Sequence, residues 1–333
     1  MNDIKVGIIG FGYTGRLHAQ AYERVSGVRV TGVADVQVPC AELTSKYRFY
    51  SDYRRVLETD IDAVSVCLPT WLHCEVALAA LERGKHVLVE KPIAASMKEA
   101  REMLNAARSS GKTLFVGMTH RFYPELREAK ARIDDGAIGS IVMCNDRLLE
   151  HFGFLNLPGW YLDKRQAGGG AVLTSGIHLI DRVRWFADDE VAQVGGFASN
   201  PYFNGPVEDM AQIFLRLRGG VPAQISLALM RAEHPLVCDL ELVGSKGTLR
   251  VHTWKGYEIQ TPHSHIEKAF YTTEPHASRV LAGLTAEVEE FCRSIREERA
   301  PWPPAEDSVK SLQVVMVFYR AVATGQMENA DAF

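Results

Sequence analysis

Apolar runs alternate with amphipathic stretches over the first 120 residues of the chain. The runs are rich in β-branched residues, and the stretches between them have the helical spacing of apolar positions. Near-continuous apolar strands separated by helices are typical of a parallel sheet covered on both faces. The pattern predicts a doubly wound α/β domain, a Rossmann architecture that binds ligands beyond the carboxyl ends of its strands. The predicted strands are residues 4–10, 28–35, 62–69, 85–92 and 112–118.

The pattern after residue 120 indicates an antiparallel sheet. Apolar residues occupy every second position from Ala223 to Leu229, and tight turns are expected at residues 219–220 and 245–247. Alternation joined by short turns is typical of an antiparallel sheet with one buried and one free face. The free face of a large open sheet is a natural surface for forming a homodimer or homotetramer.

Length, charge and cysteine content narrow the class of protein. The chain has 333 residues, about twice a typical domain, and we expect domains at 1–120 and 121–333, with the last helix packing back on the first. The net charge of −4 argues against a nucleic-acid-binding protein. Six scattered cysteines without a C-x-x-C pair favour free thiols over a zinc site or a disulfide framework. Without a signal peptide or a membrane-spanning apolar run, we expect a cytoplasmic location.

Three glycines after the first predicted strand indicate a dinucleotide site. Gly10, Gly12 and Gly15 form G-x-G-x-x-G between a strand and a helix, which is the context that this motif requires. The alternative is a glycine-rich turn without a ligand. Asp35, at the end of the second predicted strand, favours the dinucleotide, because an acid there binds the ribose 2′-hydroxyl. Its charge repels a 2′-phosphate, and Val36 and Gln37 follow without an arginine, so NAD is expected over NADP.

Residues 90–92, Glu-Lys-Pro, make the prediction more specific. Together with residues 10–22, 64–73, 117–133 and 168–181, they make the chain resemble the Gfo/Idh/MocA family, named after glucose–fructose oxidoreductase, inositol dehydrogenase and a rhizopine catabolism protein. The resemblance covers residues 4 to about 325. It implies a Rossmann domain followed by an α/β domain with an open, mostly antiparallel sheet, and hydride transfer between nicotinamide and a hydroxyl or carbonyl of a sugar, cyclitol or related polyol. Dimers and tetramers built on the open sheet are common in the family.

Lys91 is the first candidate for the base that accepts the hydroxyl proton. It closes the fourth predicted strand, and burial or a neighbouring positive charge lowers the pKa of a lysine toward working pH. The alternative is a solvated lysine at a strand end, and the family resemblance favours catalysis. The peptide bond before Pro92 is a candidate for the cis form, which would aim the lysine inward.

His178 is the second candidate, in a helical stretch that follows the glycines at 168–170. A lone histidine in an apolar helix is more often a core residue, but glycines there let the backbone approach a ligand or cofactor. Thr174, His178 and Asp181 share one face by helical spacing, which meets Lys91 across the substrate in the resembling dehydrogenases. Dehydrogenases of the family often have aspartate where this chain has Thr174, so a Lys–Asp–His relay does not carry over whole. We expect Lys91 and His178 to share the proton handling and Thr174 to bind a substrate hydroxyl.

Two further segments supply aromatic and cationic side chains that suit a polyol or an acidic sugar, or that pack in an ordinary core. The predicted substrate-binding residues are Lys91, His120, Arg121, Tyr123, Trp160, Arg165, Thr174 and His178. The predicted cofactor-binding residues are Gly10, Gly12, Tyr13, Thr14, Gly15, Asp35, Leu68, Pro69, Thr70, His73, Glu90 and Lys91. For His73, the alternative to lining the nicotinamide pocket is capping the following helix.

Three functions compete. The first is an NAD-dependent dehydrogenase acting on CH–OH groups of a small molecule. The second is a hydrolase or lyase on the same fold that holds NAD tightly and uses transient oxidation. The third is a regulator that senses NAD or a sugar without catalysis, which the retained Lys91 and His178 disfavour. A metalloenzyme is not expected, because the sequence has no H-E-x-x-H motif and no compact Cys/His cluster.

Overall fold

The computed structural model divides the chain into two compact units. The described residues are 3–37, 45–151, 159–231, 234–271 and 273–331. The first unit comprises Met1–Thr119 and Val280–Val309, and the second comprises His120–Arg279 and Lys310–Phe333. Five cysteines are described and are free thiols, whereas Cys40 lies outside the described residues.

The first unit contains a six-stranded sheet in the order β3-β2-β1-β4-β5-β6, and every neighbouring pair is parallel. The prediction of a parallel doubly wound sheet is confirmed. The sequence pattern missed β3, because its three residues are too short a run to show a pattern. The strands are β1 (Ile4–Ile9), β2 (Val28–Ala34), β3 (Arg48–Tyr50), β4 (Ala63–Val66), β5 (His86–Glu90) and β6 (Leu114–Gly117).

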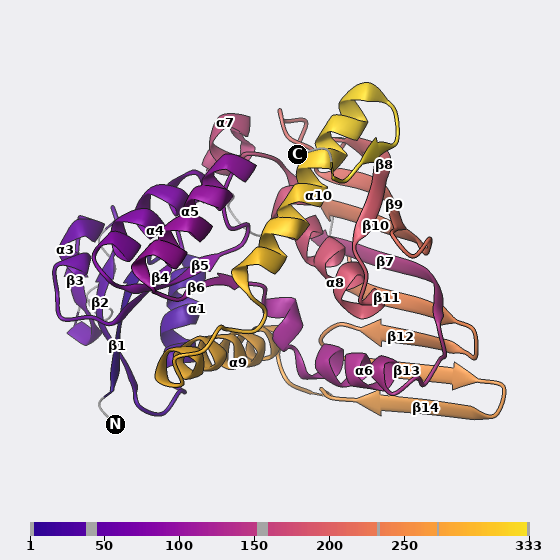
Figure 1. Ribbon diagram of the computed structural model, residues 1–333, viewed down its shortest axis with the longest axis horizontal. Helices are drawn as coiled ribbons and strands as arrows, with labels where there is room; N and C mark the ends of the chain where they lie inside the picture. Colours follow the sequence, from indigo (N-terminus) through magenta and orange to yellow (C-terminus); the bar gives the residue numbers. More distant parts are fainter. Residues whose placement is uncertain (1–2, 38–44, 152–158, 232–233, 272, 332–333) are drawn as a thin grey trace. The chain divides into compact units, whose positions relative to one another are not determined.

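The helices of the first unit begin and end at residues of the expected types. Asp52 and Ser96 accept hydrogen bonds from backbone N–H groups in the first turns of α3 and α5, which satisfies donors that a helix N-terminus leaves unpaired. Gly111 ends α5 with φ +65°. Figure 1 shows α4 and α5 side by side against this sheet. The helices are α1 (Tyr13–Tyr22), α3 (Tyr53–Leu57), η1 (Thr70–Leu72), α4 (His73–Glu82), α5 (Met97–Ser110), η2 (Thr119–Phe122, whose Thr119 alone belongs to this unit) and, from Val280 onward, α9 (His276–Arg296).

The second unit contains a nine-stranded mixed sheet in the order β14-β13-β12-β11-β7-β10-β9-β8-β15. All neighbouring pairs are antiparallel except β7 and β10, which run parallel. The expected mostly antiparallel sheet is therefore confirmed, as are the turns at residues 219–220 and 245–247. The strands are β7 (Ile141–His151), β8 (Val191–Ser199), β9 (Met210–Leu217), β10 (Pro222–Met230), β11 (Val237–Gly244), β12 (Thr248–His252), β13 (Gly256–Thr261), β14 (Ser264–Ala269) and β15 (Glu328–Asn329).

Helices pack on the apolar face of this sheet, and a buried ion pair joins α8 to β7. Arg182 Nε donates to Asp146 Oδ2 over 3.0 Å, and both side chains are 0% exposed. Arg182 Nη1 also donates to Thr253 Oγ1 over 2.7 Å. The helices are α6 (Pro124–Asp134), η3 (Gly159–Leu162), α7 (Lys164–Ala167), the π-helix η4 (Val172–Gly176), α8 (Ile177–Ala187) and α10 (Ala305–Thr324), of which the part from Lys310 belongs to this unit.

Among the described residues, no helix is both long and apolar enough to cross a membrane.

The pair between Arg182 and Asp146 yields a stability prediction. Asp146→Ala leaves a buried guanidinium without its counter-charge, which costs about 3–5 kcal/mol, so the urea midpoint should fall sharply. Arg147→Ala is the matched control, because Arg147 is 53% exposed in its ion pair with Asp239. Exposed pairs contribute about 0–1 kcal/mol. Equal shifts of the two urea midpoints would contradict the prediction.

Candidate functional site

The glycine-rich turn between β1 and α1 has the geometry that the sequence predicts. A Cβ atom on Gly10, whose φ is +88°, would lie 2.4 Å from the carbonyl oxygen of Cys67, and one on Gly15 would lie 2.0 Å from that of Gly10. A Cβ atom on Gly12 would meet no atom within 4 Å. Gly10 and Gly15 are therefore required by packing, and Gly12 leaves open space at the N-terminus of α1, where a pyrophosphate can meet backbone N–H groups.

Asp35 follows β2 and orders this turn. Its Oδ2 accepts a hydrogen bond from Phe11 N over 2.6 Å, and its Oδ1 accepts one from Gln37 N over 2.8 Å. Each carboxylate oxygen can accept a further hydrogen bond, and the side chain is only half-buried. The carboxylate is thus fixed beside the glycine-rich turn with capacity left for a ribose hydroxyl.

His73 joins the loops that follow β4 and β5. Its Nε2 lies 2.7 Å from Leu68 O and its Nδ1 lies 2.8 Å from Pro92 O. Two carbonyl acceptors favour a doubly protonated ring, while burial lowers the pKa of His73 and opposes that charge. The ring therefore braces both loops from inside the first unit. Of the neighbouring predicted residues, Tyr13 is 68% exposed and Thr70 is buried.

Glu90 ends β5, Lys91 follows it directly, and the Lys91–Pro92 peptide bond is cis. Glu90 Oε1 lies 2.9 Å from Nε2 of the fully buried His18, and Glu90 Oε2 accepts a hydrogen bond from Lys91 N over 3.2 Å. Burial opposes the charge on Glu90, but His18 and the Lys91 ammonium together hold the pKa of this carboxyl below its ordinary value. Glu90 is consequently an anion that is fixed beside Lys91.

The second unit brings the two predicted histidines together. The rings of His120 and His178 stack with centroids 4.2 Å apart and planes within 9°. Tyr123 lies 5.5 Å from His120 by ring centroids. Residues from η2, the start of α6 and α8 thus form one aromatic cluster, with both histidines buried.

Trp254 and His276 complete this cluster and were missed by the sequence analysis. The Trp254 ring meets those of His120, Tyr123 and His276 edge-on. Its backbone adopts φ +64° and is held by Glu125, which accepts from Trp254 N over 2.7 Å. Its buried indole Nε1 has no hydrogen-bond partner among the described residues. Nothing local in the sequence around Trp254 signals this position, because it depends on contacts with distant segments.

The glycines at 168–170 fit against Glu208 and Tyr319 in the same unit. A Cβ atom on Gly169 would lie 2.2 Å from the Tyr319 hydroxyl, and one on Gly170 would lie 2.0 Å from Glu208 O. The Glu208 carboxylate accepts from the backbone N–H groups of Gly170 and Val172 and from the Tyr319 hydroxyl. Packing inside the second unit thus accounts for two of the three glycines, and approach to a cofactor stays a prediction.

The Thr174 hydroxyl donates to the backbone of its own helix. Its Oγ1 lies 3.0 Å from Gly170 O, and a single hydroxyl proton makes one such bond at a time. While it donates there, the hydroxyl oxygen keeps its capacity as an acceptor, and a contact of Thr174 with a substrate hydroxyl stays a prediction. Its place in the π-helix η4, just before the α8 residue His178, is consistent with a functional segment, because π-helices are frequent at functional sites.

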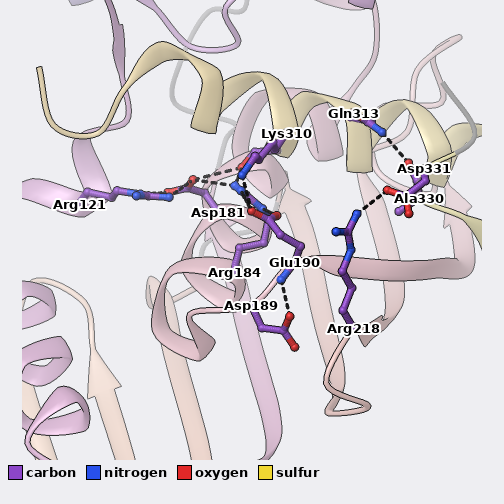
Figure 2. Close-up of polar contacts among 11 residues, drawn as sticks. Arg121, Asp181, Arg184, Asp189, Glu190, Arg218, Lys310, Gln313, Ala330 and Asp331 are labelled. Carbon is purple, nitrogen blue, oxygen red and sulfur yellow. Dashed lines mark hydrogen bonds and ion pairs between the residues drawn. The ribbon is translucent and has the colours of Figure 1, made fainter. Parts of the chain in front are cut away.

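Arg121 and Asp181 form a buried ion pair (Figure 2). Arg121 Nε and Nη2 donate to the two Asp181 oxygens over 2.7 and 2.8 Å, and the side chains are 4% and 1% exposed. Ser311 also donates to Asp181 over 3.1 Å. These contacts give both charges a structural role that ties η2 to α8, and a substrate contact of Arg121 stays a prediction. The same holds for the half-buried Trp160 in η3 and for Arg165, whose side chain lies outside the described part of the chain.

Two family models match the chain. One is an oxidoreductase family with an NAD-binding Rossmann fold, over residues 4–118, and the other is the GFO/IDH/MocA C-terminal domain, over residues 126–250. The 1,5-anhydro-D-fructose reductase of Ensifer adhaerens is 31% identical over 282 residues, which cover 82% of this chain and 81% of that protein. The inositol 2-dehydrogenase of Rubrobacter xylanophilus is 25% identical and covers 98% of this chain and 93% of that protein. A solved structure of a levoglucosan dehydrogenase with NADH and levoglucosan has a TM-score of 0.86 at 21% identity, covering 99% of this chain and all of that one.

The parallel sheet, the glycine-rich turn and Asp35 define an NAD-binding oxidoreductase. The chain belongs to the Gfo/Idh/MocA family. The predicted family, fold class, cofactor and enzyme class are confirmed. The residues present fit NAD, because Gly12 leaves open space at a helix N-terminus and Asp35 stands fixed beside it.

The different roles of the three glycines yield a test. Gly12 has φ −71°, so Gly12→Ala is compatible with the backbone and should fold normally, while its methyl group occupies the space that a pyrophosphate would use. We expect NAD binding, followed by calorimetry, to weaken about tenfold or more with an unchanged melting temperature. Gly15→Ala should lower the melting temperature instead, because its Cβ collides with Gly10 O. A melting temperature lowered equally in both variants would contradict these roles.

Proposed function

We propose that this protein is an NAD-dependent dehydrogenase that interconverts a hydroxyl and a carbonyl group on a sugar, cyclitol or related polyol. Residues 1–120 would bind NAD and residues 121–333 the substrate. The observation that carries the proposal is Lys91, held at the carboxyl end of β5 in the same unit as the glycine-rich turn. The relatives named for anhydrofructose, inositol and levoglucosan support the substrate class.

The roles follow from what each group can do chemically. Bound NAD supplies the hydride acceptor in the oxidation direction. Lys91, as a neutral amine, accepts the hydroxyl proton, and the charge of Glu90 beside it stabilises the ammonium that forms. His178 shares the proton handling, and Thr174 accepts a hydrogen bond from a second substrate hydroxyl. The rings of Trp254 and Tyr123 provide apolar faces for the C–H groups of a sugar ring, as aromatic side chains do in such sites.

A screen of polyols, aldoses and sugar acids with NAD and with NADP tests this function. We expect NADH formation on members of one of these classes, with NAD preferred because of Asp35. Lys91→Met should lower kcat by about 100-fold or more, the size of a general-base effect. Lys98→Met, which changes an exposed lysine of α5, is the matched control and should keep wild-type turnover.

The outcomes separate the competing functions. Normal turnover of Lys91→Met on the identified substrate would refute the base assignment. An enzyme that is purified with NAD that does not exchange, and that catalyses hydrolysis or elimination, would favour the redox-assisted alternative. Preference for NADP would refute the role of Asp35.

We also propose that copies of the chain form a homodimer or homotetramer through the outer face of the nine-stranded sheet. Phe197 and Phe214 are 74% and 40% exposed. Phe214 alternates with buried residues along β9, and Phe197 of β8 pairs with Gln212, which lies on the same face as Phe214. Both rings therefore lie on the face that the sheet's own core leaves open. The five free thiols favour a reducing compartment, and we infer a cytoplasmic location.

Light scattering after size-exclusion chromatography tests the oligomer. The double variant Phe197→Asp and Phe214→Asp should run at half the wild-type mass or less, because two charges would be buried in the interface. Ile266→Asp is the matched control, since Ile266 is 42% exposed and pairs with Ile259 on the opposite, core-facing side. A wild-type monomer, or a double variant with wild-type mass, would overturn the proposal.

A further inference from the structure

Three ionisable side chains from distant parts of the chain meet at the carboxyl end of β5. His18 comes from α1, Glu90 from β5 and Glu287 from α9, and one polar atom of each lies within 4.8 Å of the others. His18 and Glu287 are both 0% exposed. All three belong to the first unit, and the Glu90 side chain accepts a hydrogen bond from the backbone N–H of Lys91.

The carboxyl groups of Glu90 and Glu287 lie close together and differ in their hydrogen-bond partners. A Cβ atom on Gly117 would lie 3.3 Å from Glu90 Oε1 and 3.4 Å from Glu287 Oε1, so glycine is what leaves room for both. Glu90 has His18 and Lys91 as partners, whereas neither oxygen of Glu287 makes a full hydrogen bond within the described residues. Two buried carboxylates this close do not both ionise, because each charge opposes the other.

The surrounding groups decide which carboxyl carries the proton. Burial and the charge of Glu90 raise the pKa of Glu287 to about 8, against the opposing effects of His18, the Thr119 hydroxyl and Lys91. Burial opposes the charge on His18, but Cys67 and Glu90 outweigh it and raise the pKa of this histidine. Four further groups face the cluster: Tyr22 from α1, Cys67 after β4, Lys91 directly after β5 and Thr119 from η2.

We propose that Glu287 is a positioning residue for Lys91. Glu287 holds the proton that the cluster shares, so Glu90 is the single carboxylate charge beside the lysine. This inference rests on Lys91 as the base. A second carboxylate charge would favour the ammonium form of Lys91, which cannot accept a proton. Ionisation of Glu287 therefore lowers the fraction of Lys91 that is a neutral amine, and a neutral Glu287 carboxyl preserves that fraction.

Infrared spectroscopy tests the proton without using activity. Difference spectra of the whole enzyme between pH 6 and pH 10 should contain the C=O stretch of a buried carboxylic acid, which disappears as the pH rises through about 8. Glu287→Gln should lose this titrating band. Glu289→Gln, the same change on the exposed side of α9, should keep it. In Lys91→Met the band should persist to higher pH, because the positive charge that favours ionised Glu287 is gone.

The pH dependence of kcat/KM in the oxidation direction tests the coupling to Lys91. Its rising limb reports deprotonation of the base. In Glu287→Gln this limb should move to lower pH by up to about one unit, the coupling at which two groups titrate as a pair. Glu289→Gln should give the wild-type profile. A structural role of Glu287 alone would lower kcat/KM at every pH and leave the limb in place.

Three outcomes would overturn the inference, and all of them differ from failure of the proposed function. The first is the absence of a titrating carboxylic acid band that depends on Glu287, and the second is a limb in Glu287→Gln that matches the wild type. The third is a stoichiometric divalent cation found by elemental analysis, since the cation would replace the proton. If Lys91→Met turned over normally, the base assignment would fail, while the infrared band would still report on Glu287.

Discussion

Charge that is removed from water has to be matched, and this constraint shapes both units. An unpaired buried ion costs several kcal/mol. Three buried pairs hold the elements next to the predicted site residues: His18 with Glu90, Arg121 with Asp181, and Arg182 with Asp146. The first fixes the end of β5, and the other two fix α8. Each pair joins elements that are remote in sequence and anchors the segments that carry Lys91 and His178. Removing one partner of a pair would leave the other as an unpaired buried charge. Glu287 is the exception, because within the described part of the chain no cationic side chain is hydrogen-bonded to its carboxyl group. In our proposal it avoids the cost of an unpaired charge by keeping a proton.

The parts of the site that obey local rules could be predicted from the sequence. Gly15 meets a steric limit set by the nearby Gly10 O, and Gly10 adopts the positive φ of a tight turn. Asp35 follows from its distance along one strand–helix–strand unit. Trp254 and Glu287 obey no local rule. Glu287 is one of three acids within four residues of α9, and only the meeting of α9 with Glu90 distinguishes it from its exposed neighbour Glu289.

The hydrophobic pattern alone could not predict the full strand order of the second sheet. Alternation identified which side chains of β10 face the core, because that depends on period alone. It could not identify β7 as a parallel neighbour, since β8, β9 and the helices between them separate the two strands in the sequence. The glycines at 168–170 show the same limit. The sequence suggested that they let the backbone approach a ligand. In the structure Tyr319, about 150 residues later, occupies the space that a side chain on Gly169 would need.

The π-helix η4 gives this chain a way to vary the geometry around Thr174 at small cost. Its turn closes through one residue more than an α-helical turn, and it lies between the clamp at Glu208 and the anchored helix α8. Deleting one residue there would restore a regular helix with both ends still in place, and would rotate Thr174 relative to His178 by about 100°. The position of the Thr174 hydroxyl could thus change in a single evolutionary step, without rebuilding the core around it.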